Sequence, residues 1–184
     1  MKNLIVILMG GLSGERKISF LTGRACSNAL KKRGYNVKEL DAKGSFLEKL
    51  KKLKPKLVFN ALHGKYGEDG FVQSMLEALK ISYTHSGVLA SSLAMDKELS
   101  RLVFRRNKMK VPKYFVFQTT KKESLKNKIK NKKIKFPIVI KPINEGSSLG
   151  VFICRNSREL LKDYNKLSKD YDRILVEQYI PGKE

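Results

Sequence analysis

The first 60 residues alternate between short apolar runs and amphipathic segments, and this alternation limits the possible folds more than any other feature. An apolar run at residues 4–9 is followed by a glycine-rich loop and then by a helical pattern that ends at Gly34. The pattern next predicts a strand, a helix and a strand at residues 36–40, 46–53 and 57–60. Because strand–helix–strand units form parallel sheets covered by helices, the N-terminal part is predicted to have a Rossmann-like α/β fold.

The composition is that of a soluble globular protein with a large excess of positive charge. Of the 184 residues, 41% are apolar and 30% are charged, and the formal net charge is +22. No apolar run approaches the ~20 residues of a membrane span, and the run at residues 4–9 is too short for a signal peptide. The two cysteines, Cys26 and Cys154, lie in apolar settings. We therefore expect a reducing cytoplasm and no disulfide framework.

The positive charge keeps nucleic-acid binding open as an alternative. The densest cluster, at residues 121–135, contains eight lysines and one acid, Glu123. It has no aromatic side chain on which a base could stack and no arginine for bidentate base recognition. A solvated helix face is the better interpretation, so we expect neither nucleic acid nor a membrane as a partner.

A polar loop between two apolar runs is the strongest candidate for ligand binding. The runs at residues 136–140 and 151–154 predict two strands, and the loop between them contains two glycines and two serines. Glycines let a ligand approach the main chain, whose N–H groups can bind an anion. Lys141 adds a point charge where the first strand ends. The β-branched residues before Lys141 and Pro142 after it indicate a half-buried, functional ammonium group. On the loop alone, phosphate binding and an ordinary hairpin with a solvated lysine both stay open.

Polar residues also follow the strands of the N-terminal part. Glu15 comes after the first strand and its loop, and His63 follows the third strand. Because the carboxyl ends of parallel strands form ligand crevices, we expect both side chains to face one pocket. Glu68 and Asp69 beside His63 suggest a metal, but zinc is not expected, because the only other histidine is His85 and no cysteine is near.

The remaining sequence predicts a second, α+β unit. A helix of small residues is predicted at residues 86–94, and a second helix begins at residues 95–97. Further elements are predicted at residues 114–117, 122–130, 136–154, 157–168 and 174–178. Asn156 and Glu159 have the spacing of a capping box at the start of the last helix. We predict two domains, at residues 1–90 and 91–184.

Six motifs, taken together, resemble the D-alanine–D-alanine ligase family of the ATP-grasp superfamily, and the resemblance covers the whole chain. They are GGLSGER at 10–16, LHGKYGEDGFVQ at 62–73, SGV at 86–88, MDK at 95–97, FPIVIKPINEGSSLG at 136–150 and VEQYIPGKE at 176–184. One motif alone is weak evidence, but six in this order are specific. The resemblance implies a Rossmann-like N-terminal domain followed by the α+β first half of an ATP-grasp fold, with the family's C-terminal domain absent.

The resemblance also implies a role for each matching position. Glu15 would hold the ammonium group of the first D-alanine, and His63 would lie near that substrate's carboxylate. Ser147 would link toward Glu15, so Glu15 and Ser147 are the implied catalytic residues. The implied ATP contacts are Lys97, Lys141, Glu145, Ser147, Ser148, Glu177, Gln178, Ile180 and Glu184. Magnesium or manganese is expected as well, with its ligands in the absent C-terminal domain and none in this chain.

The implied activity is the ATP-dependent synthesis of D-alanyl-D-alanine for the peptidoglycan of the cell wall, and hence for cell shape. The first D-alanine would attack the γ-phosphate of ATP, and the amine of the second would attack the resulting acyl phosphate. The full-length enzyme is expected to be a cytoplasmic homodimer. Another ATP-grasp carboxylate–amine ligase, of the D-alanine–D-lactate type, stays open, because the residues that select the second substrate are expected in the absent domain. A non-catalytic basic nucleic-acid-binding protein is the less favoured alternative.

Because the chain resembles a fragment of such an enzyme, we expect it to be inactive alone. We also expect it to be prone to association. Ile138, Ile140 and Val176 are predicted to lie on the sheet face that would meet the absent domain, where exposed apolar area promotes association.

Overall fold

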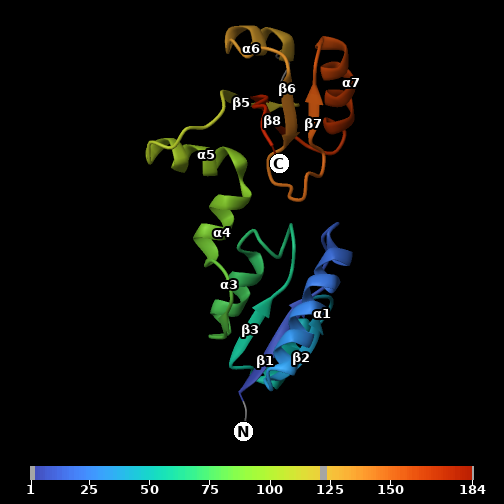
Figure 1. Cartoon of the computed structure of the whole chain (residues 1–184), viewed down its shortest axis with the longest axis vertical. Coiled ribbons are helices and arrows are strands. Elements are labelled where there is room, and N and C mark those ends of the chain that lie inside the picture. The colour runs from blue at the N-terminus through green and yellow to red at the C-terminus, as the bar shows by residue number, and fades with distance from the viewer. Residues whose placement is uncertain (1–2, 121–123, 184) are drawn as a thin grey trace. The chain divides into compact units, whose positions relative to one another are not determined.

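The computed structural model describes residues 3–120 and 124–183. The chain divides into two compact units, Met1–Ala94 and Met95–Glu184, which are described separately below (Figure 1). The predicted domain boundary at residue 90 lies within helix α4 (Val88–Met95). None of the helices in the described part of the chain combines the length and the apolar character that crossing a membrane requires.

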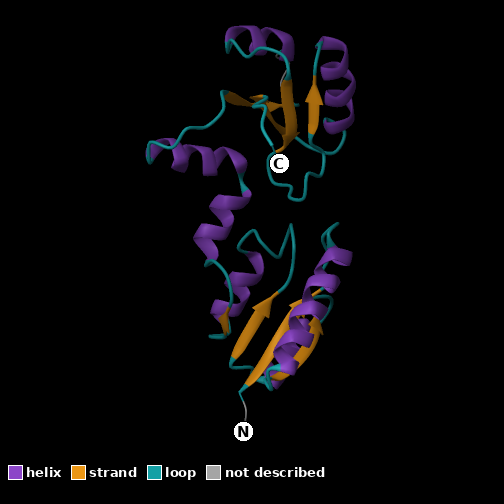
Figure 2. Ribbon diagram, in the orientation of Figure 1, coloured by secondary structure: helices purple, strands orange, loops and turns teal. Residues whose placement is uncertain are grey.

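The first unit is a parallel sheet with helices on both faces, as the sequence predicted (Figure 2). Its strand order is β2-β1-β3-β4, with bounds β1 (Leu4–Met9), β2 (Asn36–Asp41), β3 (Leu57–Asn60) and β4 (Ser82–Tyr83). Three helices pack on it, namely α1 (Arg16–Lys32), α2 (Phe46–Leu53) and α3 (Phe71–Ala78). The central strand β1 reads as one apolar run because both of its faces are covered.

The two faces of β1 have different helical partners. Val6 and Leu8 pack with Leu50 of α2 and Leu76 of α3. Ile7 and its neighbours on the other face pack under α1, whose buried positions are small residues. A Cβ atom added at Gly23 of α1 would lie 2.7 Å from the Cβ atom of Met9, so the absence of a side chain there lets α1 lie close to the sheet.

The second unit is an antiparallel sheet with its core on one face. Its strand order is β5-β8-β6-β7, with bounds β5 (Tyr114–Gln118), β6 (Ile138–Pro142), β7 (Phe152–Cys154) and β8 (Arg173–Gln178). Its helices are α5 (Lys97–Arg106), α6 (Leu125–Asn131) and α7 (Ser157–Leu167). Phe117 and Ile174 of the sheet share a buried core with Ile129 of α6 and Leu160 of α7. The predicted start of the lysine-rich helix, at residues 122 and 123, lies outside the described residues.

The prediction that Ile138, Ile140 and Val176 lie on an exposed sheet face is wrong. All three side chains are fully buried in the core under α6 and α7. Side chains alternate between the two faces of a strand, and the registers pair Ile140 with Val176 and Val139 with Glu177. The residues that alternate with these three along the strands, including Lys141, therefore lie on the other face. A continuous β-branched run does not show which parity will face the helices.

Side-chain caps fix where two helices of the second unit begin. Asp96 Oδ1 accepts hydrogen bonds from the backbone N–H groups of Glu98 and Leu99, at 2.8 and 3.0 Å, and so starts α5. Asn156 caps α7 in the same way. Glu159 differs from the predicted capping box, because its Oε2 atom accepts from the backbone N–H of Arg155, at 2.7 Å, and its Oε1 atom accepts from the side-chain amide of Asn156.

Candidate functional site

The second unit gathers three cations around one buried carboxylate. Lys97 and Arg101 lie one turn apart on α5 and so share a helix face, while Lys141 ends β6 and Glu177 lies on β8. Arg101 Nη2 is 2.5 Å from Glu177 Oε2, and Lys141 Nζ pairs with Glu177 Oε1. Each oxygen of the Glu177 carboxylate is thus paired with one cation.

These charges are largely withdrawn from solvent. The exposed fractions of the side chains are 6% for Glu177, 13% for Arg101 and 19% for Lys141. A buried charge without a partner costs several kcal/mol, so each member of the cluster depends on the others. Glu177 and Glu145, whose charge also acts on Lys97, supply two negative charges against three positive ones, and the cluster therefore favours an additional anion.

Lys97 belongs to the same cluster and bridges it to the loop after β6. Its Nζ atom donates hydrogen bonds to the carbonyl oxygens of Ile143 and Glu145, at 3.2 and 2.5 Å. Burial lowers the pKa of Lys97, and the positive charges of Lys141 and Arg101 lower it further, against the opposing effect of the Glu145 and Glu177 carboxylates. A bound anion would counteract the effect of these charges and stabilise the protonated lysine.

The loop after β6 has an unusual backbone. Ser147 and Ser148 have left-handed conformations, with φ values of 45° and 59°. Such conformations are costly for residues with a side chain, and they recur at ligand sites. With Lys97 and Lys141 the loop lines a cavity of about 250 Å³. Successive N–H groups in turns of this kind can hold an anion.

The other predicted ATP contacts are distributed as follows. Glu145 lines the same cavity, and its Oε1 atom accepts a hydrogen bond of 3.4 Å from the hydroxyl of Tyr171. Gln178 and Ile180 follow Glu177 but do not line this cavity, and Ile180 is 60% exposed. Glu184 lies outside the described residues.

Arg101 is a site residue that the sequence analysis missed. The sequence did contain a signal for it, because Arg101 lies four residues after Lys97 on a helix whose start is fixed by the Asp96 cap. This spacing puts both side chains on one face. Pairing with Glu177, 76 residues away, is a feature that sequence spacing does not reveal.

In the first unit, hydrogen bonds through Ser13 connect Glu15 and His63. The Ser13 hydroxyl donates to the carbonyl oxygen of His63 at 2.7 Å and accepts from the backbone N–H of Glu15 at 3.2 Å. The Glu15 carboxylate is buried next to Gly64, where an added Cβ atom would be 2.7 Å from Oε1. The structure therefore holds a buried carboxylate and a histidine at the carboxyl edge of the sheet, as predicted for the ends of parallel strands.

The imidazole of His63 is itself held from two sides. Its Nε2 atom is 3.0 Å from the hydroxyl of Thr22, and its Nδ1 atom is 3.5 Å from a carboxylate oxygen of Glu68. His63 lines a cavity of about 280 Å³ between the first and third βα loops, with mainly apolar walls. Glu15 does not line it, so this cavity does not bear out the prediction that both side chains face one pocket.

An ion pair that sequence reasoning missed fixes the loop after β1. Arg16 donates to both carboxylate oxygens of Asp41, at 2.8 and 2.5 Å, and to the carbonyl oxygen of Gly11 at 2.7 Å. The hydrogen bonds from Arg16 lower the pKa of Asp41. Gly10 has a φ of +77°, and a Cβ atom added there would lie 2.4 Å from Asp41 Oδ1. This loop therefore tolerates only a residue without a side chain at position 10.

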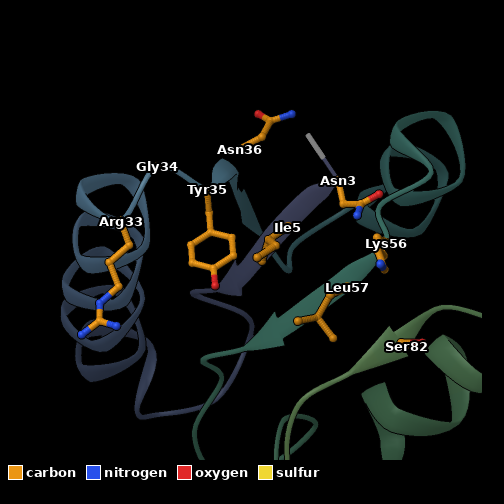
Figure 3. A pocket seen from close by; sticks show the side chains of 9 residues that line it. All are labelled: Asn3, Ile5, Arg33, Gly34, Tyr35, Asn36, Lys56, Leu57 and Ser82. Atoms are coloured by element: carbon orange, nitrogen blue, oxygen red, sulfur yellow. The ribbon is translucent and has the colours of Figure 1, made fainter. Parts of the chain in front are cut away.

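A cavity of about 680 Å³ lies at the opposite, amino-terminal edge of the same sheet (Figure 3). Ile5 and Leu57 line it from neighbouring strands, and Arg33 and Lys56 contribute charged groups. None of the predicted site residues lines it. Because polar loops at the carboxyl ends of strands are where such sheets bind ligands, we place the candidate site at the other edge despite its smaller cavity.

Within the described ranges no three His, Cys, Asp or Glu side chains form a group that could hold a metal ion.

Comparison with known protein families identifies the class to which this arrangement belongs. A model described as D-ala D-ala ligase N-terminus matches residues 39–86, and one described as D-ala D-ala ligase C-terminus matches residues 103–184. Together the two matches cover well over half of the chain. The chain therefore belongs to the D-alanine–D-alanine ligase family.

Individual relatives match the sequence of this chain along nearly its whole length. A D-alanine–D-alanine ligase of Pelagibacter ubique is 47% identical over 184 residues, which are 100% of this chain and 60% of that protein. One of Wolbachia pipientis wMel is 47% identical over 98% of this chain and 56% of its own length. The chain thus spans a little over half the length of the curated relatives it matches.

Solved structures show the same fold. A D-alanine–D-alanine ligase from Bacillus anthracis superimposes with a TM-score of 0.86 at 32% identity, over 98% of this chain and 58% of that one. A structure of the Bacillus anthracis ligase complexed with ATP gives a TM-score of 0.84 at 30% identity, over 98% of this chain and 60% of that one. The predicted fold class, a Rossmann-like parallel sheet followed by an α+β unit, is confirmed, and the sheet of the second unit is antiparallel.

Proposed function

We propose that this chain supplies the ATP site and the first-substrate site of a D-alanine–D-alanine ligase, an enzyme of peptidoglycan synthesis. The observation that carries the proposal is the cluster of Lys97, Arg101 and Lys141 beside the 250 Å³ cavity of the serine–glycine loop. An excess of buried positive charge next to such a loop suits the phosphates of a nucleotide. The names of the relatives, and the ATP complex of the Bacillus anthracis ligase, support the same assignment.

In this proposal the second unit binds ATP. Lys97 and Lys141 neutralise the phosphates, and the loop at Ser147 and Ser148 closes over them. The Glu177 carboxylate accepts a hydrogen bond from the 6-amino group of adenine, because a carboxylate can act only as an acceptor. Gln178 and Ile180 complete the adenine contacts, Glu184 takes the ribose, and Glu145 lies beside the phosphate cavity.

The first unit binds the first D-alanine. Glu15 is a buried carboxylate at the carboxyl edge of the sheet, and a carboxylate is the natural partner for an ammonium group. Its place at the start of α1 also suits a negative charge, because the helix dipole is positive there. His63, held by Thr22 and Glu68, is assigned to the substrate carboxylate.

The reaction follows from these contacts. A carboxylate oxygen of the first D-alanine attacks the γ-phosphorus of ATP, the bond to ADP breaks, and an acyl phosphate forms. The amine of the second D-alanine then attacks the acyl carbon, loses a proton, and inorganic phosphate leaves. The residues of this chain contribute positioning and charge neutralisation. Magnesium or manganese is general for such reactions, but no three His, Cys, Asp or Glu side chains of the described residues form a group that could hold it.

The test is the binding of ATP and of tripolyphosphate, measured by isothermal titration calorimetry between pH 7 and pH 10. Because the pKa of Lys97 lies below its ordinary value, this lysine loses its proton earlier than a solvated lysine as the pH rises. Affinity for both ligands should therefore fall with rising pH. A Lys97→Arg variant, which stays charged, should lose less affinity over the same range.

The arginine variant also serves as the control, since the protonation of the ligands themselves affects both proteins equally. Absence of binding to the unchanged chain at pH 7 would overturn the assignment of the nucleotide site. Equal pH dependence of the two proteins would show that Lys97 is not part of the nucleotide site.

A further inference from the structure

One guanidinium group connects α5 to β8 in the second unit. Arg101 Nη2 contacts Glu177 Oε2 at 2.5 Å, and Arg101 Nη1 donates to the backbone carbonyl oxygen of Lys97 at 2.9 Å. The same group lies 5.5 Å from the centre of the Tyr114 ring on β5. Arg101 is thus held by the start of its own helix and by two neighbouring strands.

The two cations on Glu177 occupy different positions. Lys141 pairs with Oε1 and also lines the cavity of the serine–glycine loop, whereas Arg101 pairs with Oε2 and is not among the residues that line that cavity. An ammonium is a point charge on a flexible chain, but a guanidinium is planar and fixes the direction of its donors. Arg101 therefore determines the orientation of the carboxylate, while Lys141 is placed to contact the anion.

We propose that Arg101 is a positioning residue for the selection of the base, acting through Glu177 rather than on the phosphates. This inference rests on the proposed function, in which Glu177 accepts the 6-amino group of adenine. By holding both Glu177 and the Lys97 carbonyl, Arg101 sets the distance between the base-reading carboxylate and the phosphate lysine. Without this contact, Lys141 is the remaining cation on Glu177 and draws the carboxylate toward the phosphate cavity.

The chemistry of the 6-position gives this role a specific readout. ATP carries an amino group there, which donates to a carboxylate. Inosine triphosphate carries a carbonyl oxygen at the same position, which a carboxylate repels. A carboxylate held in one orientation discriminates between the two nucleotides, and a mobile one loses this discrimination. Tripolyphosphate has no base, so its affinity reports the phosphate contacts alone.

The experiment measures the affinities of the 184-residue chain for ATP, inosine triphosphate and tripolyphosphate by calorimetry. The variants are Arg101→Lys, which keeps the charge but not the planar fork, and Arg101→Met, which removes both. The control is Arg105→Met, which removes a positive charge from an exposed position one turn further along the same helix. Circular dichroism confirms that each variant is folded, and Arg101→Lys carries the test if Arg101→Met does not fold.

The unchanged chain should bind ATP more tightly than inosine triphosphate. Arg101→Lys should weaken ATP binding about tenfold, on the scale of one charged hydrogen bond, and should reduce the preference for ATP by a similar factor. Its tripolyphosphate affinity should stay within about twofold of the original, because the local charge is kept. Arg101→Met should lose the preference as well, with some loss for all three ligands, and Arg105→Met should leave the preference unchanged.

The possible failures are distinguishable. If the unchanged chain binds neither ATP nor tripolyphosphate, the proposed function falls and this inference falls with it. If the unchanged chain binds ATP but shows no preference over inosine triphosphate, or if Arg101→Lys keeps the full preference, only the positioning role is overturned. An equal loss for all three ligands in Arg101→Lys would likewise overturn it, since that pattern indicates a general change of structure.

Discussion

The two units place their candidate functional residues in different ways. In the first unit, Glu15 and His63 come from loops after parallel strands. Ser13 forms hydrogen bonds with backbone atoms of both residues, and Thr22 contacts the His63 imidazole. In the second unit, Lys141 and Glu177 lie within the strands themselves, on the face opposite to the core. A loop can present a side chain in many directions, whereas a strand offers only two. The position of a residue in its strand therefore decides whether it serves the core or the site.

The two units also differ in how deeply a representative ion pair is buried. In the first unit, the side chains of Lys31 and Glu39 are 48% and 37% exposed. In the second unit, those of Arg101 and Glu177 are 13% and 6% exposed. Exposed pairs contribute little to stability, whereas removing one member of a buried pair leaves an unpaired charge. The comparison indicates that Arg101 and Glu177 depend on each other far more than Lys31 and Glu39 do.

The largest expected effect tests this interdependence. Glu177→Leu leaves Arg101 and Lys141 without their shared carboxylate and should lower the free energy of unfolding by about 3–5 kcal/mol. Lys31→Met, which removes one member of the exposed pair, should cost less than about 1 kcal/mol. Both values come from urea unfolding monitored by circular dichroism. Similar losses of unfolding free energy in the two variants would contradict the difference between the buried and the exposed ion pair.

A second effect tests which face of β6 belongs to the core. Ile140→Ala removes a fully buried side chain and should cost about 2–5 kcal/mol. Val139→Ala changes a half-buried neighbour on the opposite face and should cost roughly 1 kcal/mol, because less apolar area is lost there. The same unfolding measurement applies, and a larger cost at position 139 would contradict the face assignment.

The smallest effect concerns the loops of the first unit. Gly64 has a φ of +67°, and a Cβ atom added there would lie 2.7 Å from the Glu15 carboxylate. Gly44 has a similar φ of +62° but nothing within 4 Å of an added Cβ atom. Both alanine variants pay the cost of a left-handed residue, about 1 kcal/mol.

The difference between these two variants isolates the contact with Glu15. Gly64→Ala should therefore cost about 1 kcal/mol more than Gly44→Ala, on the scale of a crowded or displaced polar group. Their melting temperatures provide the measurement. Equal costs would mean that Glu15 moves aside freely and is not held in one position.

The order and type of the elements could be predicted from the sequence, because the signals for them are local. The apolar run of β1, the glycines beside it and the caps at Asp96 and Asn156 each act within a few residues. These signals also predicted the parallel sheet, since strands separated by helices leave few other topologies. Polar loops after strands predicted one pocket for Glu15 and His63; the structure places both residues at the same edge of the sheet, but only His63 lines the cavity there.

Only the tertiary structure decided which side chains share a face and which charges meet. The run Ile138–Ile140 reads the same whichever parity is buried, and packing under α6 and α7 chose Ile138 and Ile140. The grouping of Arg101, Lys141 and Glu177 required β6 to pair antiparallel with β8 and α5 to lie against their free face. Such contacts join distant parts of the chain, and their energy depends on burial, which a local sequence pattern does not encode.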